Sequence, residues 1–205
     1  MFERVFISLK ACKDGFNKGC TPILGFDGCF LKGYCKGMLL AAIGIDPNNS
    51  QYPVAFAVVE KENTSSWRWF LHLLSEDLQI NNPRRFTLIS DRQKGLEKAL
   101  GEIFPGAEIR FCVRHLHANF KINHGGLLLK QLLWSCARAT TRAEFTRRMH
   151  VLKEEDDKAH AWLLKKDPLN GQNHISELTL NVICYSIICV RASTRPLLMQ
   201  ETSRL

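Results

Sequence analysis

Residues 22–31 read PILGFDGCFL, and this stretch decides the fold. The segment is short and apolar, which is typical of a strand. Asp27 lies inside it, and Gly28 follows directly. Because burying a carboxylate is costly unless something compensates its charge, an acid in such a strand is a candidate functional residue. The stretch therefore predicts a strand that carries part of a site.

Two further apolar runs follow, at residues 37–46 (GMLLAAIGID) and 52–60 (YPVAFAVVE). The turn-forming cluster PNNS at residues 47–50 separates them. Together with residues 22–31, these runs predict three consecutive strands in an antiparallel meander.

Helices and strands then alternate. A Thr-Ser-Ser cap at residues 64–66 precedes apolar residues at three- and four-residue steps, which predicts a helix to Leu78 with Trp67 and Trp69 as packing aromatics. The remaining predictions are a strand at 86–91, a helix at 93–104 closed by Pro-Gly, a strand at 108–113, and helices at 127–139 and 142–152 with a charged stretch to 162. Residues 178–190 fit a helix or a strand equally well. This order indicates a mixed α/β layer arrangement.

The composition, 45% hydrophobic and 23% charged, is that of an ordinary globular domain and excludes wholesale disorder or a fibrous repeat. The net charge of +8 favours a polyanionic partner such as nucleic acid, although many basic proteins never touch DNA.

The eight cysteines lack the short spacings of a disulfide framework, so reduced thiols are expected. No apolar run suits a membrane span, and neither a membrane partner nor a small-molecule substrate is expected.

Asp27 and Asp91 each lie at or near the end of an apolar strand. Carboxylates are hard oxygen ligands that suit Mg²⁺ or Mn²⁺, and two such ions can activate a water or a 3′-hydroxyl against a phosphodiester. The alternative, commoner for an arbitrary acid, is that each Asp caps a turn or pairs with a Lys or Arg.

Cys112 and His115 stand three residues apart at the end of a predicted strand. As a zinc site the pair is incomplete, because structural zinc takes four protein ligands. His117 is better explained as a solvated or packing residue. Cations surround the second acid and this pair and could hold phosphates beside a cut site. They are Arg92, Lys94, Arg110, Arg114 and Lys121.

Five blocks of the sequence, in order, carry a family resemblance. They are FDGCFLKG, LLAAIGIDPNN, YPVAFAVVEKENTSSWRWFL, TLISDRQKGL and FCVRHLHANFK. They resemble the signature blocks of plant Mutator-like (MULE) transposases in the catalytic-core region, and the similarity runs from about Phe6 to Trp162.

The resemblance implies a ribonuclease-H-like fold, a mixed sheet flanked by helices, with a C-terminal helical extension. It implies that Asp27 and Asp91 are the first two acids of a metal-binding triad and that Cys112 and His115 support it. Mg²⁺ or Mn²⁺, DNA, other transposase subunits and a nuclear location follow as expectations, although no dense basic run supplies a nuclear address.

The third acid of the family falls in a segment that resembles residues 180–187, where Tyr185 takes the place of the glutamate. A phenol stays neutral at pH 7 and cannot ligate a hard cation as a carboxylate does. Glu177 is the fallback, and Glu144 and Glu154 have weaker claims. A catalytically impaired copy is therefore expected.

Four segments are expected: a lead-in at 1–20, the transposase core at 21–122, a helical insertion at 123–167 and a degenerate part of the core at 168–205. The N-terminal DNA-binding region and C-terminal zinc knuckle of complete family members find no match, so a truncated copy is expected. The competing interpretation is a non-catalytic DNA-binding or interaction module derived from a transposase.

Overall fold

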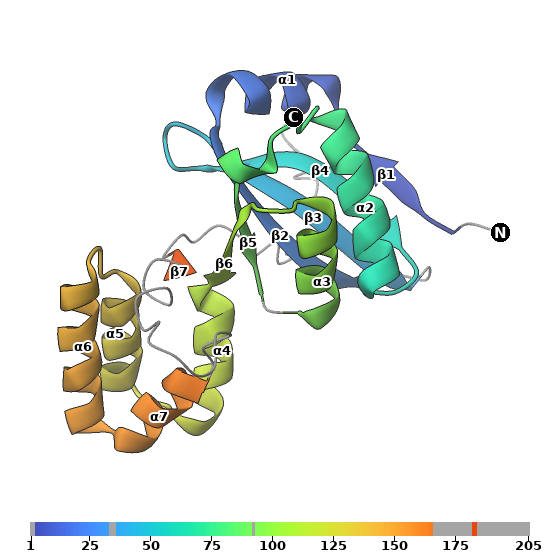
Figure 1. The fold of residues 1–205 in the computed structure, drawn as a ribbon. Helices are drawn as coiled ribbons and strands as arrows, with labels where there is room; N and C mark the ends of the chain where they lie inside the picture. The colour runs from blue at the N-terminus through green and yellow to red at the C-terminus, as the bar shows by residue number, and fades with distance from the viewer. Residues whose placement is uncertain (1–2, 33–35, 92, 166–181, 184–205) are drawn as a thin grey trace, which may run out of the picture.

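The structure, a computed structural model, describes residues 3–32, 36–91, 93–165 and 182–183 (Figure 1). The strands are β1 (Val5–Ile7), β2 (Thr21–Leu31), β3 (Gly37–Ile45), β4 (Gln51–Val59), β5 (Thr87–Ser90), β6 (Glu108–Cys112) and β7 (Val182–Ile183). The helices are α1 (Lys10–Gly19), α2 (Thr64–Asp77), α3 (Lys94–Ile103), α4 (Val113–Asn123), α5 (Leu127–Ala137), α6 (Arg142–Glu155) and α7 (Asp157–Lys165), with a 3₁₀ turn at Pro83–Arg85.

The strands form one mixed sheet in the order β1-β4-β3-β2-β5-β6-β7. The three strands predicted as a meander, β2, β3 and β4, pair antiparallel, which confirms that prediction. β5 then pairs parallel with β2, and β6 parallel with β5. An antiparallel hairpin pair extended by parallel strands through helical crossovers is consistent with the ribonuclease-H-like arrangement expected from the sequence.

One face of the sheet carries the main apolar core. Alternate residues of β2, such as Leu24 and Phe26, point to this face and are almost fully buried. Figure 1 shows α2 and α3 lying across it. Trp67 of α2 is 0% exposed and meets Phe26 edge to face, while Trp69 is partly buried against the same core. Both tryptophans therefore pack as the sequence predicted.

The opposite face carries a smaller apolar cluster that includes Ala41, Ile43 and Ile89. It holds the other set of alternate side chains, because successive residues of a strand point to opposite faces. Asp27 pairs with Ala41 across β2 and β3 and so belongs to this second face.

The helices α4 to α7 form a separate group beside the sheet, with α4 leading out of β6 (Figure 1). Their own apolar cluster includes Phe120, Leu133 and Leu152, and it shares no buried member with the main core. We refer to α4–α7 as the helical group.

Several local expectations need correction. Helix α2 is capped by Asn63, whose side chain accepts from the Ser66 amide, and not by the predicted Thr-Ser-Ser cluster. The predicted strand at 108–113 ends at Cys112, where α4 begins, and α6 continues past Leu152 to Glu155. Strand β1 and helix α1 were not predicted, and α4 lies in the stretch from Val113 to about Leu164 whose pattern is helical, although no bounds for it were predicted. Within the described residues, Cys12, Cys20, Cys29, Cys112 and Cys136 are free thiols, and no helix is long and apolar enough to cross a membrane.

A candidate acidic site at the strand ends

Asp27 and Asp91 come together because of the register between β2 and β5. The parallel pairing runs Ile23 with Thr87, Leu24 with Leu88 and Gly25 with Ile89. Continued by two residues, the same register sets Asp27 beside Asp91, which directly follows β5. Neighbouring strands lie about 4.8 Å apart, and equivalent positions share a face, so the two carboxylates project from the same side of adjacent strands.

The hydrogen bonds of the two acids are local. Asp27 Oδ1 accepts from the Gly28 amide at 2.9 Å, and Asp91 Oδ1 accepts from the Gln93 amide at 3.0 Å. Among the described residues, neither acid has an ion-pair partner. The alternative that each acid merely neutralises a Lys or Arg therefore finds no support in this part of the chain.

Burial dominates the electrostatics of Asp27. It raises the pKa of this carboxyl from 3.8 to about 6; nearby His115 lowers the pKa, and the Asp91 charge raises it. Raised pKa values of this kind arise where a charged group lacks full compensation. A divalent cation between the two acids would supply that compensation.

Glu62 is a third carboxylate beside the pair, and the sequence analysis missed it. A Cβ built on Gly28 would lie 3.1 Å from the Glu62 Cδ and Oε1 atoms, so this carboxylate rests against β2 one residue after Asp27, on the main-core face and not on the face of the Asp27 side chain. It accepts from the Trp67 indole at 3.1 Å. Burial raises its pKa, with Asp91 adding to the rise. The available signal was its position directly before the α2 cap, within the block that resembles the family.

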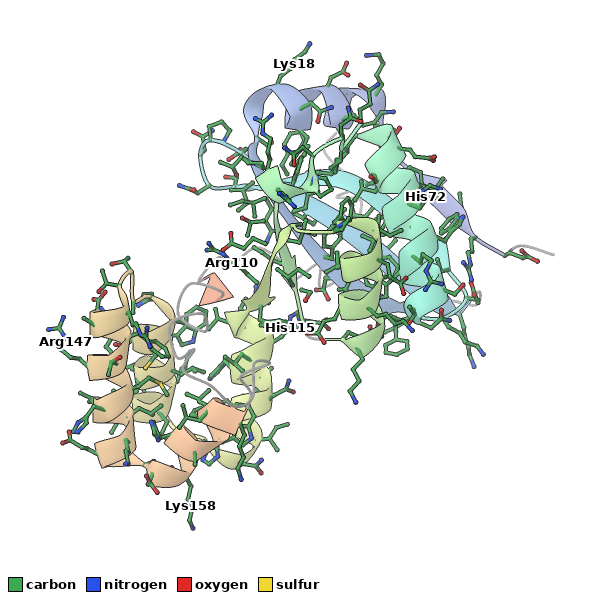
Figure 2. The ribbon with its side chains drawn as sticks, in the orientation of Figure 1. Lys18, His72, Arg110, His115, Arg147 and Lys158 are labelled. Carbon is green, nitrogen blue, oxygen red and sulfur yellow. The ribbon has the colours of Figure 1, made fainter. Side chains whose placement is uncertain are left out.

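Cys112 and His115 meet at the junction of β6 and α4, where Figure 2 labels His115. Contact with Cys112 raises the pKa of His115 to about 8 against the opposing effect of burial, and Asp27 and Asp91 add to the rise. Burial would raise the pKa of the Cys112 thiol, yet the interactions with His115 outweigh it and lower that pKa. The contact therefore shifts the thiol toward its deprotonated form and the imidazole toward its protonated form, and the negative charges of the two acids act on the imidazole in the same direction.

The predicted phosphate-binding cations occupy different environments. Lys94 is exposed at the start of α3, and Lys121 is exposed in the last turn of α4. Arg114 is partly buried in the first turn of α4. Arg110 donates to Glu108 at 2.7 Å and is thus already engaged. Arg92 lies outside the described residues, as do Tyr185 and Glu177.

The donor chemistry of the acid pair fits a magnesium-type ion. Within the described ranges, no group of three or more His, Cys, Asp or Glu side chains is close enough to hold a metal. Mg²⁺ does not require such a cage, because it usually keeps several waters and takes one or two carboxylates plus substrate phosphates. Two neighbouring carboxylates that form no ion pair among the described residues meet that requirement, whereas zinc, with its four protein ligands, is not supported.

Asp27 lies inside β2, four residues before its end, and only Asp91 directly follows the end of its strand. The mixed-sheet topology, with this acid pair on adjacent strands, is consistent with an α/β protein of the ribonuclease-H-like class. The comparison with family models is more specific: residues 23–119, which run from β2 into α4, match the model of the MULE transposase domain. The match supports a Mutator-like transposase origin for this protein. A search of the curated proteins found no match.

Proposed function

We propose that this chain is the catalytic-core region of a Mutator-like DNA transposase of plant type, with metal-dependent strand cleavage and transfer assigned to Asp27 and Asp91. The observation that carries the proposal is the β2–β5 register, which aligns the two acids on one face of the sheet. The family match over residues 23–119 agrees with it. DNA is the substrate, other transposase subunits are partners, and a nuclear location follows from that substrate.

The roles of the side chains follow from their positions. Asp27 and Asp91 would hold Mg²⁺ or Mn²⁺, which supplies Lewis-acid activation of a water or 3′-hydroxyl and stabilises the leaving oxygen. His115, cationic below a pH of about 8, limits the repulsion between the acids. Lys94, Arg114 and Lys121 are assigned to the flanking phosphates.

Impaired catalysis is part of the proposal, because Tyr185 stands where the family has its third acid. A neutral phenol provides neither the charge nor the ligand geometry of a carboxylate. We therefore expect the chain with Tyr185 to catalyse strand transfer weakly or not at all.

The test is DNA nicking in Mn²⁺ by the wild-type chain and by Tyr185→Glu, with Ser186→Glu as a control that adds the same charge one position away. We expect Tyr185→Glu to raise nicking by about a hundredfold, the lower end of what one positioned catalytic group contributes, and Asp27→Ala in that background to remove the gain. Equal nicking with and without both aspartates would reject the assignment.

The second candidate is a non-catalytic DNA-binding or interaction module derived from a transposase. Tyr185 and the net charge of +8 favour it. DNA affinity that survives loss of both acids, falls steeply with salt, and comes with no nicking by Tyr185→Glu would establish this function in place of the first.

A further inference from the structure

The positive charge of the chain is concentrated in one segment. Residues 113–148 contain seven Lys and Arg and a single acid, Glu144, a net of +6 out of the +8 of the whole chain. This segment comprises α4, α5 and the first half of α6. The chain is therefore strongly basic in part of the helical group and nearly balanced elsewhere.

Most of these cations have no acidic partner. Of the seven, Arg148 pairs with Glu144. Within the described residues, Arg114, Lys121, Lys130 and Arg138 form no ion pair. A group of like charges without partners repels itself, so it destabilises the free protein and favours a polyanionic ligand.

Spacing gathers these cations on two helix faces. Arg114, His117 and Lys121 recur at steps of three and four along α4. Lys130, Trp134 and Arg138 recur at steps of four from α5 to its C-cap. Residues three or four apart lie on one side of a helix. Both rows are offset from the buried residues Phe120 and Leu133, so each helix has an apolar side and a basic side.

The two basic rows face the same region. The pKa of His117 on α4 is lowered first by burial and then by the charges of Lys130 on α5 and Lys121 on its own helix. The charge of Lys130 thus reaches His117, and the two helices are in contact through Val113 of α4, which packs with Trp134 and Ala137 of α5. We call the combined surface of Arg114, His117, Lys121, Lys130 and Arg138 the α4–α5 basic face.

A surface pocket of about 450 Å³ opens on the α5 part of this face. Its lining contains no acid and consists of Leu127, Lys130, Gln131, Trp134 and Arg138. The Arg138 guanidinium lies 5.8 Å from the centroid of the Trp134 ring, within the range of a cation–π contact. That contact orients the Arg138 side chain in advance of any ligand.

The basic face begins next to the acidic site. Val113, the first residue of α4, follows Cys112 and packs in one cluster with Trp134 and Ala137 of α5. Ser90 of β5 pairs with Phe111 of β6, and the same register continued by one residue sets Cys112 beside Asp91. Helix α4 therefore begins beside the acidic site and packs on α5 at its first residue.

We propose that the α4–α5 basic face is a binding surface for the DNA that flanks the strand held at Asp27 and Asp91, an inference that rests on the proposed function. Lys130 and Arg138 contact backbone phosphates, and Trp134 forms the floor between them. Contacts of this kind are independent of sequence and position the duplex.

Charge favours DNA over a protein partner for this face. Exposed Leu127 and Leu128 lie at the beginning of α5 and would suit an apolar partner. Cores of protein interfaces are, however, depleted in charged residues, and Lys in particular is depleted across them. The α4–α5 basic face carries cations on both helices, and no acid lines its pocket. Phosphate groups therefore match it better than an apolar protein partner does.

The experiment measures binding of the full chain to a fluorescent duplex of mixed sequence by anisotropy over a range of salt concentrations. The test variant is the double substitution Lys130→Gln with Arg138→Gln. The matched control is Lys18→Gln with Lys98→Gln, which removes the same charge from exposed positions on α1 and α3; Figure 2 shows Lys18 pointing away from the molecule.

We expect the test variant to bind at least about tenfold more weakly at 0.1 M salt and to lose roughly 2 from the slope of log Kd against log salt, because each phosphate contact contributes about 0.9. The control should keep the wild-type slope.

Equal slopes for the test and control variants would show that the α4–α5 basic face does not bind DNA, while DNA would remain the substrate of the proposed function. No wild-type binding at low salt would overturn the face and the proposed function together. A wild-type dimer in sedimentation that the test variant lacks would instead assign the face to a second copy of the chain.

Discussion

The sheet region and the helical group differ in which of their charged side chains form ion pairs. On the sheet and its helices, three cations form ion pairs between different elements: Arg4–Glu60 at 2.7 Å, Lys13–Asp77 at 2.5 Å and Arg68–Glu102 at 2.6 Å. Asp27 and Asp91 also belong to this region, and among the described residues neither forms an ion pair. In the helical group, the cations of α4 and α5 stay unpaired within the described residues. Charges that a fold leaves unpaired, of either sign, are the ones available to a ligand.

The largest expected effect tests whether the two regions are separate apolar units. Trp67 belongs to the main core and Phe120 to the helical group, and each is 0% exposed. Each truncation to Ala should cost about 3–5 kcal/mol in its own unit. Hydrogen exchange should rise in residues 113–165 for Phe120→Ala and leave β2–β5 protected. Exchange that rises throughout the chain for both variants would show one cooperative unit instead.

A smaller effect tests the uncompensated acid. Since burial raises the pKa of Asp27 to about 6, the folded chain holds this proton more tightly than the unfolded chain, and stability falls as pH rises from 3.8 through about 6. Asp27→Asn should therefore be more stable than wild type by about 1–3 kcal/mol at pH 7 without divalent metal, and the gain should shrink at pH 4.

Asp156 provides the control of opposite sign in that denaturation series. It accepts from the Ala159 amide, which lowers its pKa, so its contribution is present above its unfolded pKa and lost in acid. Asp156→Asn should be less stable than wild type at pH 7. A variant of Asp27 that loses stability at pH 7 in the same way would mean that the native fold already compensates this acid.

The smallest expected effect concerns the attachment of α1 to the sheet. A Cβ on Gly44 would lie 2.7 Å from Cδ2 of buried Phe16 in α1, so Gly44→Ala should cost about 1–3 kcal/mol. Gly101 in α3 has nothing within 4 Å, and Gly101→Ala should stabilise by about 0.5–1 kcal/mol. Thermal unfolding distinguishes them. A Gly44→Ala protein as stable as wild type would show that α1 is not fixed against the sheet.

The sequence predicted the sheet core well because its strands are apolar runs bounded by turn residues. It missed α1 because Phe16 is the one buried residue of that helix, which leaves no apolar stripe. It missed the boundary at Cys112 because α4 continues directly from β6 with no turn residue between them. Contiguous elements without a break in composition are hard to separate by pattern.

For the site, the position of Asp27 and Asp91 in or after apolar runs made them candidates, and the family resemblance of the surrounding blocks singled them out from ordinary capping or ion-paired acids. Their alignment depends on the β2–β5 register, a long-range property that no local pattern contains. Glu62 and the α4–α5 basic face were missed for the same reason. Glu62 approaches Gly28 through the packing of α2, and the rows of α4 and α5 combine only when the helices pack.

Divalent-metal binding tests the central claim most directly. Calorimetric titration of the full chain with Mn²⁺ at pH 7 should show binding that is weakened at least about tenfold by Asp27→Asn and equally by Asp91→Asn, since both acids serve one ion site. The double variant should be no weaker than either single one, while Asp156→Asn keeps the wild-type affinity. Unchanged Mn²⁺ affinity after loss of both aspartates would contradict the account.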